Sequence, residues 1–422
     1  MFSTKDISRF EQLETPFYYY DLSLLQTTLT ACAAAAKVYN FHVHYAMKAN
    51  FNQTVLEKIK ATGFGADCVS GGEVNKAIEL GFDKNQVVFA GVGKSDKEIK
   101  DALDHDIFCF NVESIQELEV INELAAQKGK KAKVAIRINP NVDAHTHHNI
   151  TTGLDENKFG INSWDLTACA DMLKNCPQLE FIGIHFHIGS QITNLDVYKN
   201  LCVRVNEFAA WFEDRGFMIK VLNVGGGLGI DYHNPEQQVP DFAAYFKIFQ
   251  DFLEVRSNQE VHFELGRALV GQSSSLISKV LYVKNGKKKN FIILDAGMTE
   301  LMRPALYQAY HKIENISAET AIVASAENGV DAEKGVNSAE TVDSAEKGVD
   351  SAEKGVDAET VVKYDVVGPI CESTDCFGKE VELQETKRGD LIAIRSTGAY
   401  GEVMASHYNL REAVNVAFSE EG

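Results

Sequence analysis

Short apolar runs alternate with longer amphipathic stretches between residues 41 and 267 of the chain. The short runs have the length of strands and the longer stretches repeat apolar residues at helical spacing, so the region predicts strand–helix units and a parallel sheet. The eight predicted strands are Phe41–Met47, Gly65–Ser70, Val87–Gly91, Ile107–Val112, Lys133–Asn139, Phe181–Gly189, Val221–Gly227 and Val261–Arg267. Helical patterns lie between them, over Gln53–Thr62, Glu73–Leu80, Ser95–His105, Ser114–Gln127, Ser163–Asn175, Leu195–Arg215 and Asp241–Val255. Eight units in roughly 230 residues predict a (β/α)8 TIM barrel, and no Gly-x-Gly-x-x-Gly follows the first strand to favour a doubly wound sheet.

The pattern changes after Arg267, where β-rich segments are separated by turn residues without helical stretches between them. The change predicts a second, all-β domain, a barrel or a sandwich. Its expected strands are Leu276–Val283, Phe291–Leu294, Val361–Val367, Glu380–Leu383 and Asp390–Arg395. The strand-like stretch Pro16–Tyr20 is expected to cross over to this domain. The sequence thus predicts a barrel domain at residues 21–267 and a β domain formed by residues 1–20 and 268–422.

An acidic repeat interrupts the β domain at residues 318–360, where variants of Ala-Glu-Lys-Gly-Val recur every six or seven residues. The segment holds eleven acidic and three basic residues and no aromatic residue, so it carries −8 of the formal net charge of −19. Glycine in most copies and the lack of bulky apolar residues argue against a coiled coil. We therefore predict a disordered insertion that loops out without disturbing the fold, because lengthening a surface loop costs little closure entropy.

The acidic balance argues against nucleic acid and anionic membranes as partners, since both require a basic surface. The first twelve residues carry charges and no apolar signal-peptide core, and no later apolar run has the length of a membrane span, so a cytoplasmic protein is expected. The eight cysteines form no Cys-x-x-Cys pair and most are expected to be buried thiols. Cys371 and Cys376 differ, because they lie in a stretch rich in loop-forming residues.

Lys48 closes the first predicted strand. Partial burial at that position is expected to lower the pKa of its amine and to leave a neutral fraction that can attack a carbonyl, as Schiff-base chemistry requires. A lysine that merely extends its ammonium group into solvent is the alternative. The residues at the other strand ends can distinguish a reactive amine from a solvent-exposed one, because the active sites of such barrels lie at the carboxyl ends of the strands.

Those strand ends carry residues whose chemistry fits together. They are Asp67 in the second strand, His187 in the sixth with Ser190 after it, Gly225, Gly226 and Gly227 in the seventh, and Glu264, Gly266 and Arg267 in the eighth. The glycines offer backbone N–H groups that can hold a phosphate, although a tight turn alone would also explain them. Glu264 is either a hydrogen-bonded buried carboxylate or a partner for a cation, and His187 on its own could be a core histidine.

A lysine, a phosphate cradle, a buried carboxylate and a histidine around one pocket fit pyridoxal phosphate. The lysine would hold the aldehyde carbon of the cofactor, the glycines its phosphate and the carboxylate its protonated ring nitrogen, while the imidazole would stack on the ring. This combination is much more specific than any of its members.

Five segments that carry these residues, in this order, resemble the alanine-racemase-like, fold-type III decarboxylases that use pyridoxal phosphate, and among them the diaminopimelate decarboxylases. The segments are Tyr45–Asn50, His185–Gln191, Gly225–Gly227, Glu264–Arg267 and Gly368–Asp375. The resemblance extends from about Pro16 to Arg411, apart from the acidic insertion. Leu265 departs from the proline that is usual between the glutamate and the glycine of that family, which loosens the backbone beside Glu264.

The resemblance implies a role for each site residue. Toward the cofactor, Lys48 is the Schiff-base lysine, His187 stacks on the ring and Glu264 pairs with the ring nitrogen, while Asp67 lies near Lys48 and His187. Ser190 and Gly227 contact the phosphate, beside Gly225, Gly226 and Gly266. Toward the substrate, a carboxylate is bound by Arg267, Arg303 and Tyr307; Cys371 donates a proton, Glu372 recognises the distal amino-acid centre, and Tyr400 contacts both cofactor and substrate. No metal is implied. Because Cys371 and Glu372 of this family act in the neighbouring subunit, a head-to-tail homodimer with composite active sites is expected.

The implied reaction is the decarboxylation of meso-2,6-diaminopimelate to L-lysine and carbon dioxide, the last step of lysine biosynthesis. Two arginine forks favour a substrate with a second carboxylate over ornithine, and Glu372 complements a distal ammonium group. Decarboxylation of ornithine, arginine or carboxynorspermidine, racemisation, and a non-catalytic relative remain as alternatives. A metal-dependent hydrolase is a further one, suggested by His42-x-His44, His145-x-His147-His148 and His185-x-His187.

Overall fold

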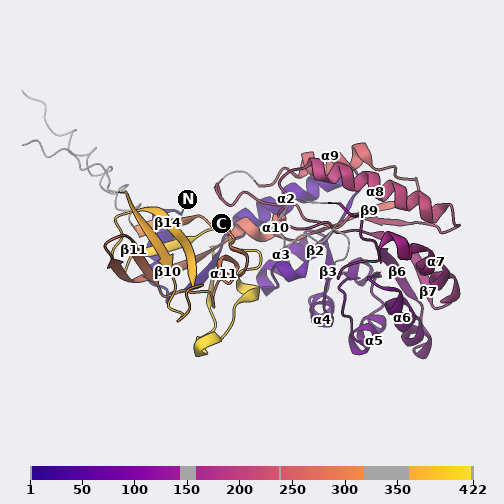
Figure 1. The fold of residues 1–422 in the computed structure, drawn as a ribbon, viewed down its shortest axis with the longest axis horizontal. Coiled ribbons are helices and arrows are strands. Elements are labelled where there is room, and N and C mark those ends of the chain that lie inside the picture. The colour runs from indigo at the N-terminus through magenta and orange to yellow at the C-terminus, as the bar shows by residue number, and fades with distance from the viewer. Residues whose placement is uncertain (1, 143–157, 237–238, 318–360, 420–422) are drawn as a thin grey trace, which may run out of the picture. The chain divides into compact units, whose positions relative to one another are not determined.

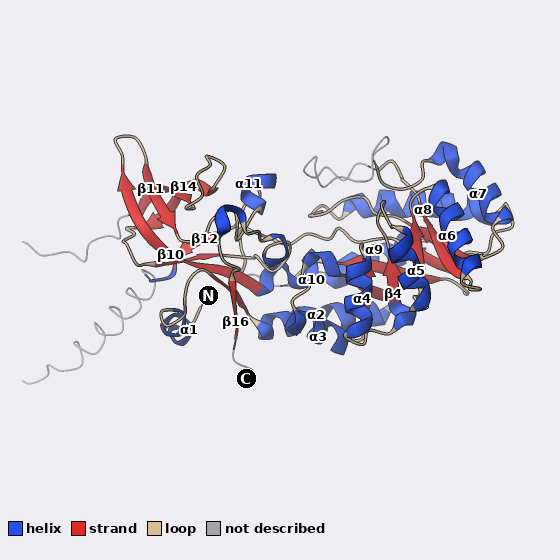
Figure 2. Cartoon of the chain, turned by 90° about the horizontal axis from the view of Figure 1, so that it is seen from below, coloured by secondary structure: helices blue, strands red, loops and turns tan. Residues whose placement is uncertain are grey.

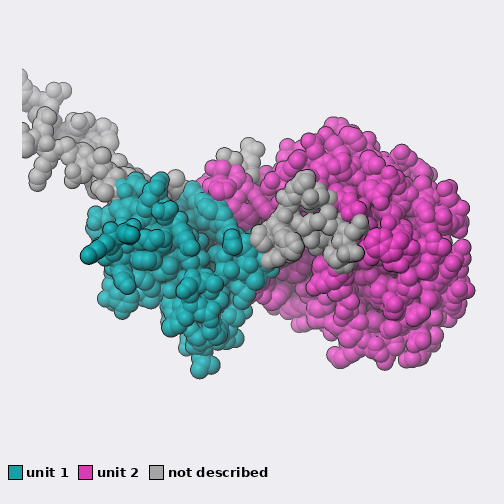
Figure 3. All heavy atoms as spheres, in the orientation of Figure 1, with its two compact units in different colours: residues 1–19, 275–395, 405–417 teal, residues 20–274, 396–404, 418–422 magenta. Residues whose placement is uncertain are grey.

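The computed structural model describes residues 2–142, 158–236, 239–317 and 361–419. The chain forms two compact units (Figure 3). The barrel unit comprises residues 20–274, 396–404 and 418–422, and the β unit comprises residues 1–19, 275–395 and 405–417. The predicted insertion at 318–360 and the histidines His145, His147 and His148 lie outside the described residues.

Within the described residues, eight parallel strands form a closed barrel in the order β2-β3-β4-β5-β6-β7-β8-β9. They are β2 (His42–Ala46), β3 (Gly65–Cys68), β4 (Val87–Phe89), β5 (Cys109–Val112), β6 (Ala132–Arg137), β7 (Leu179–His185), β8 (Val221–Asn223) and β9 (Glu260–Leu265). The barrel closes where β2 pairs with β9, in a register that sets His42 beside His262 and His44 beside Glu264. The predicted TIM barrel is therefore confirmed.

Helices lie on the outside of the barrel strands (Figures 1 and 2). They are α2 (Leu22–Val38), α3 (Gln53–Ala61), α4 (Gly71–Glu79), α5 (Asp96–Asp104), α6 (Ile115–Gln127), α7 (Leu166–Asn175), α8 (Asp196–Glu213), α9 (Phe242–Phe252) and the short α10 (Arg267–Val270). Ser70, Ser95 and Ser114 cap α4, α5 and α6, because each hydroxyl accepts the N–H of the residue three positions on. The sequence pattern did not predict α2, which precedes the first barrel strand and packs against α9.

Several barrel strands end earlier than their apolar runs predict. β2 ends at Ala46, β7 at His185 and β8 at Asn223. The buried residues beyond these ends, such as Phe186 and Val224, continue the apolar pattern without belonging to a strand. The candidate residues of the site therefore lie on short loops that a rigid barrel holds in place.

The β unit is built on a sheet with the strand order β12-β15-β10-β11-β13-β14, and β1 pairs with β10 and β16. Its elements are α1 (Thr4–Phe10), β1 (Phe17–Tyr20), β10 (Ser274–Asn285), β11 (Asn290–Leu294), α11 (Arg303–Tyr307), β12 (Ile313–Asn315), β13 (Val361–Val367), β14 (Cys376–Gln384), β15 (Leu391–Ile394) and β16 (Asn415–Phe418). The expected crossing of the N-terminal strand to this sheet is thus observed. β11 and β13 pair in parallel, whereas β10 pairs antiparallel with β11 and β15.

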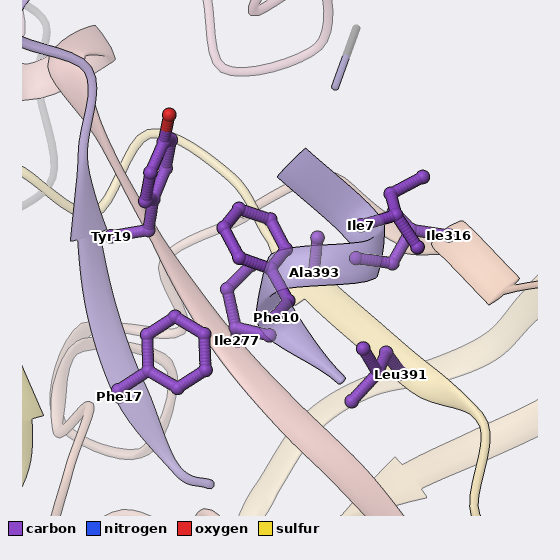
Figure 4. Close-up of a cluster of buried hydrophobic side chains, with 8 residues drawn as sticks. All are labelled: Ile7, Phe10, Phe17, Tyr19, Ile277, Ile316, Leu391 and Ala393. Atoms are coloured by element: carbon purple, nitrogen blue, oxygen red, sulfur yellow. The ribbon is translucent and has the colours of Figure 1, made fainter. Parts of the chain in front are cut away.

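A cluster of buried apolar side chains holds α1 and β1 on this sheet (Figure 4). The ring of Phe10 meets those of Phe17 and Tyr19 edge-on, with centroid separations of 5.6 and 4.8 Å. Ile277 from β10 and Leu391 from β15 complete the contact. Edge-to-face pairs of buried rings stabilise such a core beyond the burial of their area.

The chain's cysteines match the expectation that most of them are buried thiols. Cysteines 32, 68, 109, 169, 176 and 202 are buried thiols, Cys376 is half-buried, and Cys371 is exposed. Among the described residues, every helix is either too short or too polar to cross a lipid bilayer.

Candidate active site

Lys48 lies in a single 3-10 turn, Met47–Ala49, that directly follows β2 at the carboxyl end of the barrel. Two hydrogen bonds fasten this turn to residues 396–404 of the same unit, from the N–H of Tyr400 to the Ala49 carbonyl (2.8 Å) and from the Asn50 amide to the Gly398 carbonyl (2.9 Å). Tyr400 has a φ of 58°, which is rare for a bulky residue and marks a backbone held in place by its surroundings. The structure thereby brings together Lys48 and Tyr400, two of the residues that the sequence analysis singled out.

The pKa of Lys48 is raised, contrary to the expectation from burial at a strand end. Burial does lower it, but the carboxyl group of Asp67 and the charges of Tyr400 and Glu264 together have the larger, opposite effect. The expected downward shift was wrong because the opposing acids come from other strands. Lys48 is therefore held as an ammonium ion among acidic groups in the described structure.

Asp67 is buried in β3, opposite Ala46 in the pairing of β2 with β3. Burial, and next the charge of Glu264, raise the pKa of its carboxyl well above the usual range. Its Oδ1 atom has no hydrogen-bond partner among the described residues. A buried polar atom without a partner costs free energy, so this atom marks a place where a bound polar group would be stabilising.

Glu264 in β9 is held by three side-chain donors inside the barrel. Its Oε1 accepts from the amides of Asn111 (3.0 Å) and Asn223 (2.8 Å), and its Oε2 accepts from Nε2 of His185 (2.9 Å). Burial alone would raise the pKa of this carboxyl, but His185 and next His187 and Lys48 lower it well below its usual range. A carboxylate has about four lone-pair sites, so one remains for a further cationic donor.

Sequence reasoning missed the three residues that hold Glu264. Asn111 lies in β5, His185 ends β7 and Asn223 ends β8, and all three are buried. A polar residue inside an apolar strand is the sequence feature that could have identified them, because a buried polar group requires a hydrogen-bond partner. The same signal would have found Arg137, which ends β6 and donates to Glu113 at 2.8 Å.

His187 lies on the loop after β7, half-buried, and its Nδ1 accepts from the N–H of Gly226 at 3.4 Å. Burial, and next the positive charges of Lys48 and Arg137, lower its pKa well below the usual value. The ring is therefore neutral near pH 7. A neutral imidazole at this position can stack on the positively charged aromatic ring of a bound ligand without repelling it.

Close backbone contacts require glycine at three positions of the loop after β8. A Cβ atom on Gly225 would lie 2.2 Å from the Phe186 carbonyl oxygen, one on Gly226 1.8 Å from that of Glu264, and one on Gly227 2.6 Å from that of Gly189. The N–H groups of Gly225 and Gly226 are bonded to Asn223 and His187 inside the barrel. These two glycines therefore serve close packing first, which the sequence pattern alone did not reveal.

Gly266 packs the end of β9 against the turn that carries Lys48. A Cβ atom there would lie 3.0 Å from the Cβ of Ala49 and 3.2 Å from that of Ala46. Leu265, where the resemblance expects proline, stays within β9 and is buried. The departure from the family pattern thus leaves the strand that carries Glu264 regular.

The guanidinium group of Arg267 gathers polar side chains from three loops. It donates to the hydroxyls of Tyr232 (2.6 Å) and Ser190 (2.9 Å) and lies 4.9 Å from the centre of the Tyr400 ring. Tyr232 is a member of this cluster that sequence reasoning missed. The arrangement places a planar cation and two hydroxyls together, a donor set that suits a phosphate or a carboxylate.

The remaining predicted residues belong to the β unit. Arg303 is buried at the start of α11 and donates to Nε2 of His311 (2.8 Å), while Tyr307 is half-buried at the end of α11. Cys371 and Glu372 are exposed, and Glu372 accepts a hydrogen bond from the hydroxyl of Tyr408 at 2.6 Å.

The loop that carries Cys371 and Glu372 is ordered by a buried carboxylate. Asp375 accepts from the N–H groups of Ile370 and Met298, each at 2.6 Å. It therefore closes the turn from Ile370 to Asp375 around the two exposed residues and ties that turn to the segment at Met298.

The barrel end as a whole fits pyridoxal phosphate. Lys48 can hold its aldehyde carbon, Glu264 has an acceptor site left for its ring nitrogen, and Asp67 carries a buried atom that lacks a partner. Fold and side chains together define the class of a pyridoxal-phosphate enzyme on a (β/α)8 barrel.

Comparison with known proteins identifies the group within this class. The family model described as pyridoxal-dependent decarboxylase, pyridoxal binding domain, matches residues 25–271, and the chain belongs to this family. A diaminopimelate decarboxylase of Bacteroides thetaiotaomicron is 54% identical over 417 residues, which cover 98% of both chains. One of Aquifex aeolicus is 38% identical over 97% of this chain and 87% of its own. The crystal structure of diaminopimelate decarboxylase from Helicobacter pylori, complexed with L-lysine, is 35% identical with a TM-score of 0.83, covering 98% of this chain and 94% of that one.

The family membership also decides against the metal-dependent hydrolase. Of the histidine pairs that suggested it, His185 is bonded to Glu264, and His44 is bonded to His262 on the adjacent strand. The cluster at the carboxyl end of the barrel is thus explained by cofactor chemistry. His42 belongs to a different group at the other end of the barrel.

Proposed function

We propose that the protein decarboxylates meso-2,6-diaminopimelate to L-lysine and carbon dioxide. The observation that carries the proposal is the position of Lys48 and the ionised Glu264 at one end of the barrel, each shifting the pKa of the other. Relatives at up to 54% identity over nearly the full length have this activity in their names. The substrate is a small amino acid.

When bound, pyridoxal phosphate supplies a cationic ring that accepts the electron pair left when the carboxylate departs as carbon dioxide. Glu264 would hold the proton on the ring nitrogen, since its hydrogen bond to His185 and the nearby charge of Lys48 keep it ionised. Lys48 would hold the aldehyde carbon through Nζ, and the neutral His187 would cover the ring. Ser190 and Gly227 would bind the phosphate, since the N–H groups of Gly225 and Gly226 are bonded to Asn223 and His187.

We assign recognition of the substrate to two arginines and three further side chains. Arg267 would bind a carboxylate, as would Arg303 with Tyr307. Glu372 would accept hydrogen bonds from the distal ammonium group, and Cys371 would return a proton to the carbon that lost the carboxylate. The exposure of Cys371 and Glu372 suits groups that meet a substrate or a second chain.

The substrate assignment is tested by measuring carbon dioxide release from meso-diaminopimelate, ornithine, arginine and carboxynorspermidine. We expect release from meso-diaminopimelate with lysine as product. Replacing Glu372 by alanine should raise its KM about 10- to 100-fold, because a hydrogen bond between charged groups is lost. Glu382→Ala, which removes an exposed glutamate of β14, is the matched control. Faster release from another amino acid by the wild-type chain would contradict the assignment.

We propose further that the enzyme is a homodimer in which Cys371 and Glu372 complete the active site of the other copy. An exposed segment that contacts Glu372 supports a contact surface there: Tyr408, which donates to Glu372, is 49% exposed, and Leu410, two residues further along the chain, is 95% exposed. The free cysteines support a reducing compartment, and we place the enzyme in the cytoplasm.

Complementation tests the composite site. Lys48→Ala and Cys371→Ala should each be nearly inactive alone, whereas their co-expressed mixture should recover about one quarter of the wild-type activity, because half of the dimers are mixed and hold one intact site. If both residues act in the site of their own chain, no mixed dimer has an intact site and the mixture stays inactive. That result would contradict the proposal.

A further inference from the structure

A second cluster of polar side chains lies at the amino-terminal end of the barrel, away from Lys48. His42 is the first residue of β2, and Glu260 and His262 lie at the start of β9. Residues two apart on a strand share a face, and the register sets His42 beside His262. One possible ligand atom from each of the three side chains lies within 4.8 Å of the others.

A chain of hydrogen bonds assigns the proton positions on the buried histidines. Nδ1 of His44 lies 2.9 Å from the carbonyl oxygen of Gln86, and a carbonyl only accepts, so Nδ1 carries the proton. Nε2 of His44 is then the acceptor for Nδ1–H of His262 at 2.8 Å. Consequently, Nε2 of a neutral His262 bears a lone pair.

That lone pair faces a second acceptor. Oε2 of Glu260 lies 3.1 Å from Nε2 of His262, so an imidazole lone pair and a carboxylate oxygen point at each other. Such an arrangement requires a cation between or beside the two atoms. A proton could serve, but His42, whose ring stacks on that of His262 with centroids 4.8 Å apart, places a third possible ligand atom within 4.8 Å of those of His262 and Glu260.

We propose that His42, Glu260 and His262 bind a divalent transition-metal ion, for which zinc is the best match. Two imidazole nitrogens and one carboxylate are a common zinc ligand set, with bonds of about 2.0–2.2 Å. Ligand atoms of a tetrahedral ion with such bonds lie about 3.3 Å apart, close to the separation of 3.1 Å between His262 and Glu260. Solvent reaches the position, because the side chain of Glu260 is 53% exposed while that of His262 is 4% exposed.

The surroundings of His262 fix its ring as metal ligands are commonly fixed. His44 accepts from the ring nitrogen that does not face the ion, an outer contact of the kind that orients ligating histidines. The ring also stacks on Phe108, with centroids 5.5 Å apart and planes at 7°. The ligand is thus held in place before an ion binds.

The ion would join β2 to β9, the pair at which the barrel closes. Its role is structural, because the reacting groups of the proposed decarboxylase lie at the opposite ends of these strands. The inference does not rest on the proposed function. It predicts that the metal stabilises the folded chain without changing carbon dioxide release.

Calorimetric titration of the full-length, cofactor-loaded protein with zinc, after removal of metals by a chelator, tests the proposal. The wild type should bind one ion at this site and unfold at a higher temperature when zinc is present. His42→Gln and Glu260→Gln should each weaken this binding by at least about 100-fold and abolish the thermal shift. Both should release carbon dioxide at the wild-type rate.

Two control variants exclude other zinc ligands of the chain. The triple replacement of His145, His147 and His148 by glutamine removes a histidine run, and Cys371→Ser removes the exposed thiol. Each should keep the binding that His42→Gln loses. The proposal would be overturned if the wild type bound no zinc, or if His42→Gln and Glu260→Gln both bound zinc as tightly as the wild type. A proton between His262 and Glu260 would then explain their contact.

Discussion

Replacing Lys48 by alanine is expected to lower the rate of carbon dioxide release by about 10³-fold or more, the scale on which enzymes lose a nucleophile or a proton-transfer group. In the proposed site Lys48 would supply the amine that holds the cofactor, and it also places a positive charge beside the buried Asp67. The rate is measured with pyridoxal phosphate in excess, so that weakened binding of the cofactor does not by itself explain the loss.

Lys48→Arg separates the two contributions of this residue. Arginine keeps the positive charge beside Asp67 but cannot form the covalent link, so it should be as inactive as alanine. Lys76→Ala removes a lysine from a partly exposed pair with Glu79 on α4 and serves as the control that retains activity. Activity of Lys48→Arg within a few-fold of the wild type would show that the charge alone matters and would contradict the assignment.

Replacing Glu264 by glutamine should lower kcat by about 10²- to 10³-fold with little change in KM, as expected when a charge that acts mainly in the transition state is lost. The glutamine amide can still bond with Asn111 and Asn223, but it carries no charge to hold a proton on the ring nitrogen. The cofactor should remain bound, which its absorbance would report.

Glu260→Gln is the matched control, because it makes the same change at the other end of the same strand, β9. It should leave kcat unchanged. A Glu264→Gln variant whose kcat stays within about two-fold of the wild type would contradict the role of this carboxylate.

The barrel was predictable because strands of a parallel sheet are buried on both faces and appear as continuous apolar runs. Because of the same feature, the predicted ends of several strands lie beyond the observed ones. Phe186 and Val224 are apolar and buried although they lie beyond β7 and β8, so the runs extend past the last ladder pairing. α2 was missed because it precedes the first strand and therefore falls outside the alternation on which the prediction was based.

The β unit was harder to predict because its pairings are not local. β11 and β13 pair in parallel, in a register that sets Asn290 beside Tyr364, and no local pattern specifies such a pairing. The class of the domain and the crossing of β1 followed from strand-like runs alone. The strand order did not, since it depends on contacts between distant segments.

In the candidate site, the sequence indicated the residues to which we assign the chemistry and missed those that hold them in place. Lys48, His187 and Glu264 stand out because each is a chemically active residue at a strand end. Asn111 and Asn223 do not stand out, because an asparagine has many structural uses and its partner lies on another strand. The rise in the pKa of Lys48 was unpredictable for the same reason, since it depends on how close the barrel brings Asp67.

The central claim is that Lys48 at the carboxyl end of the barrel holds pyridoxal phosphate. The most direct measurement is reduction of the cofactor-loaded protein with borohydride, which makes the link to the amine permanent, followed by digestion and mass spectrometry of the peptides. We predict one modified lysine per chain, and that this lysine is Lys48. Modification of another lysine, such as the buried Lys94 that pairs with Glu117, or no modification at all, would contradict the claim.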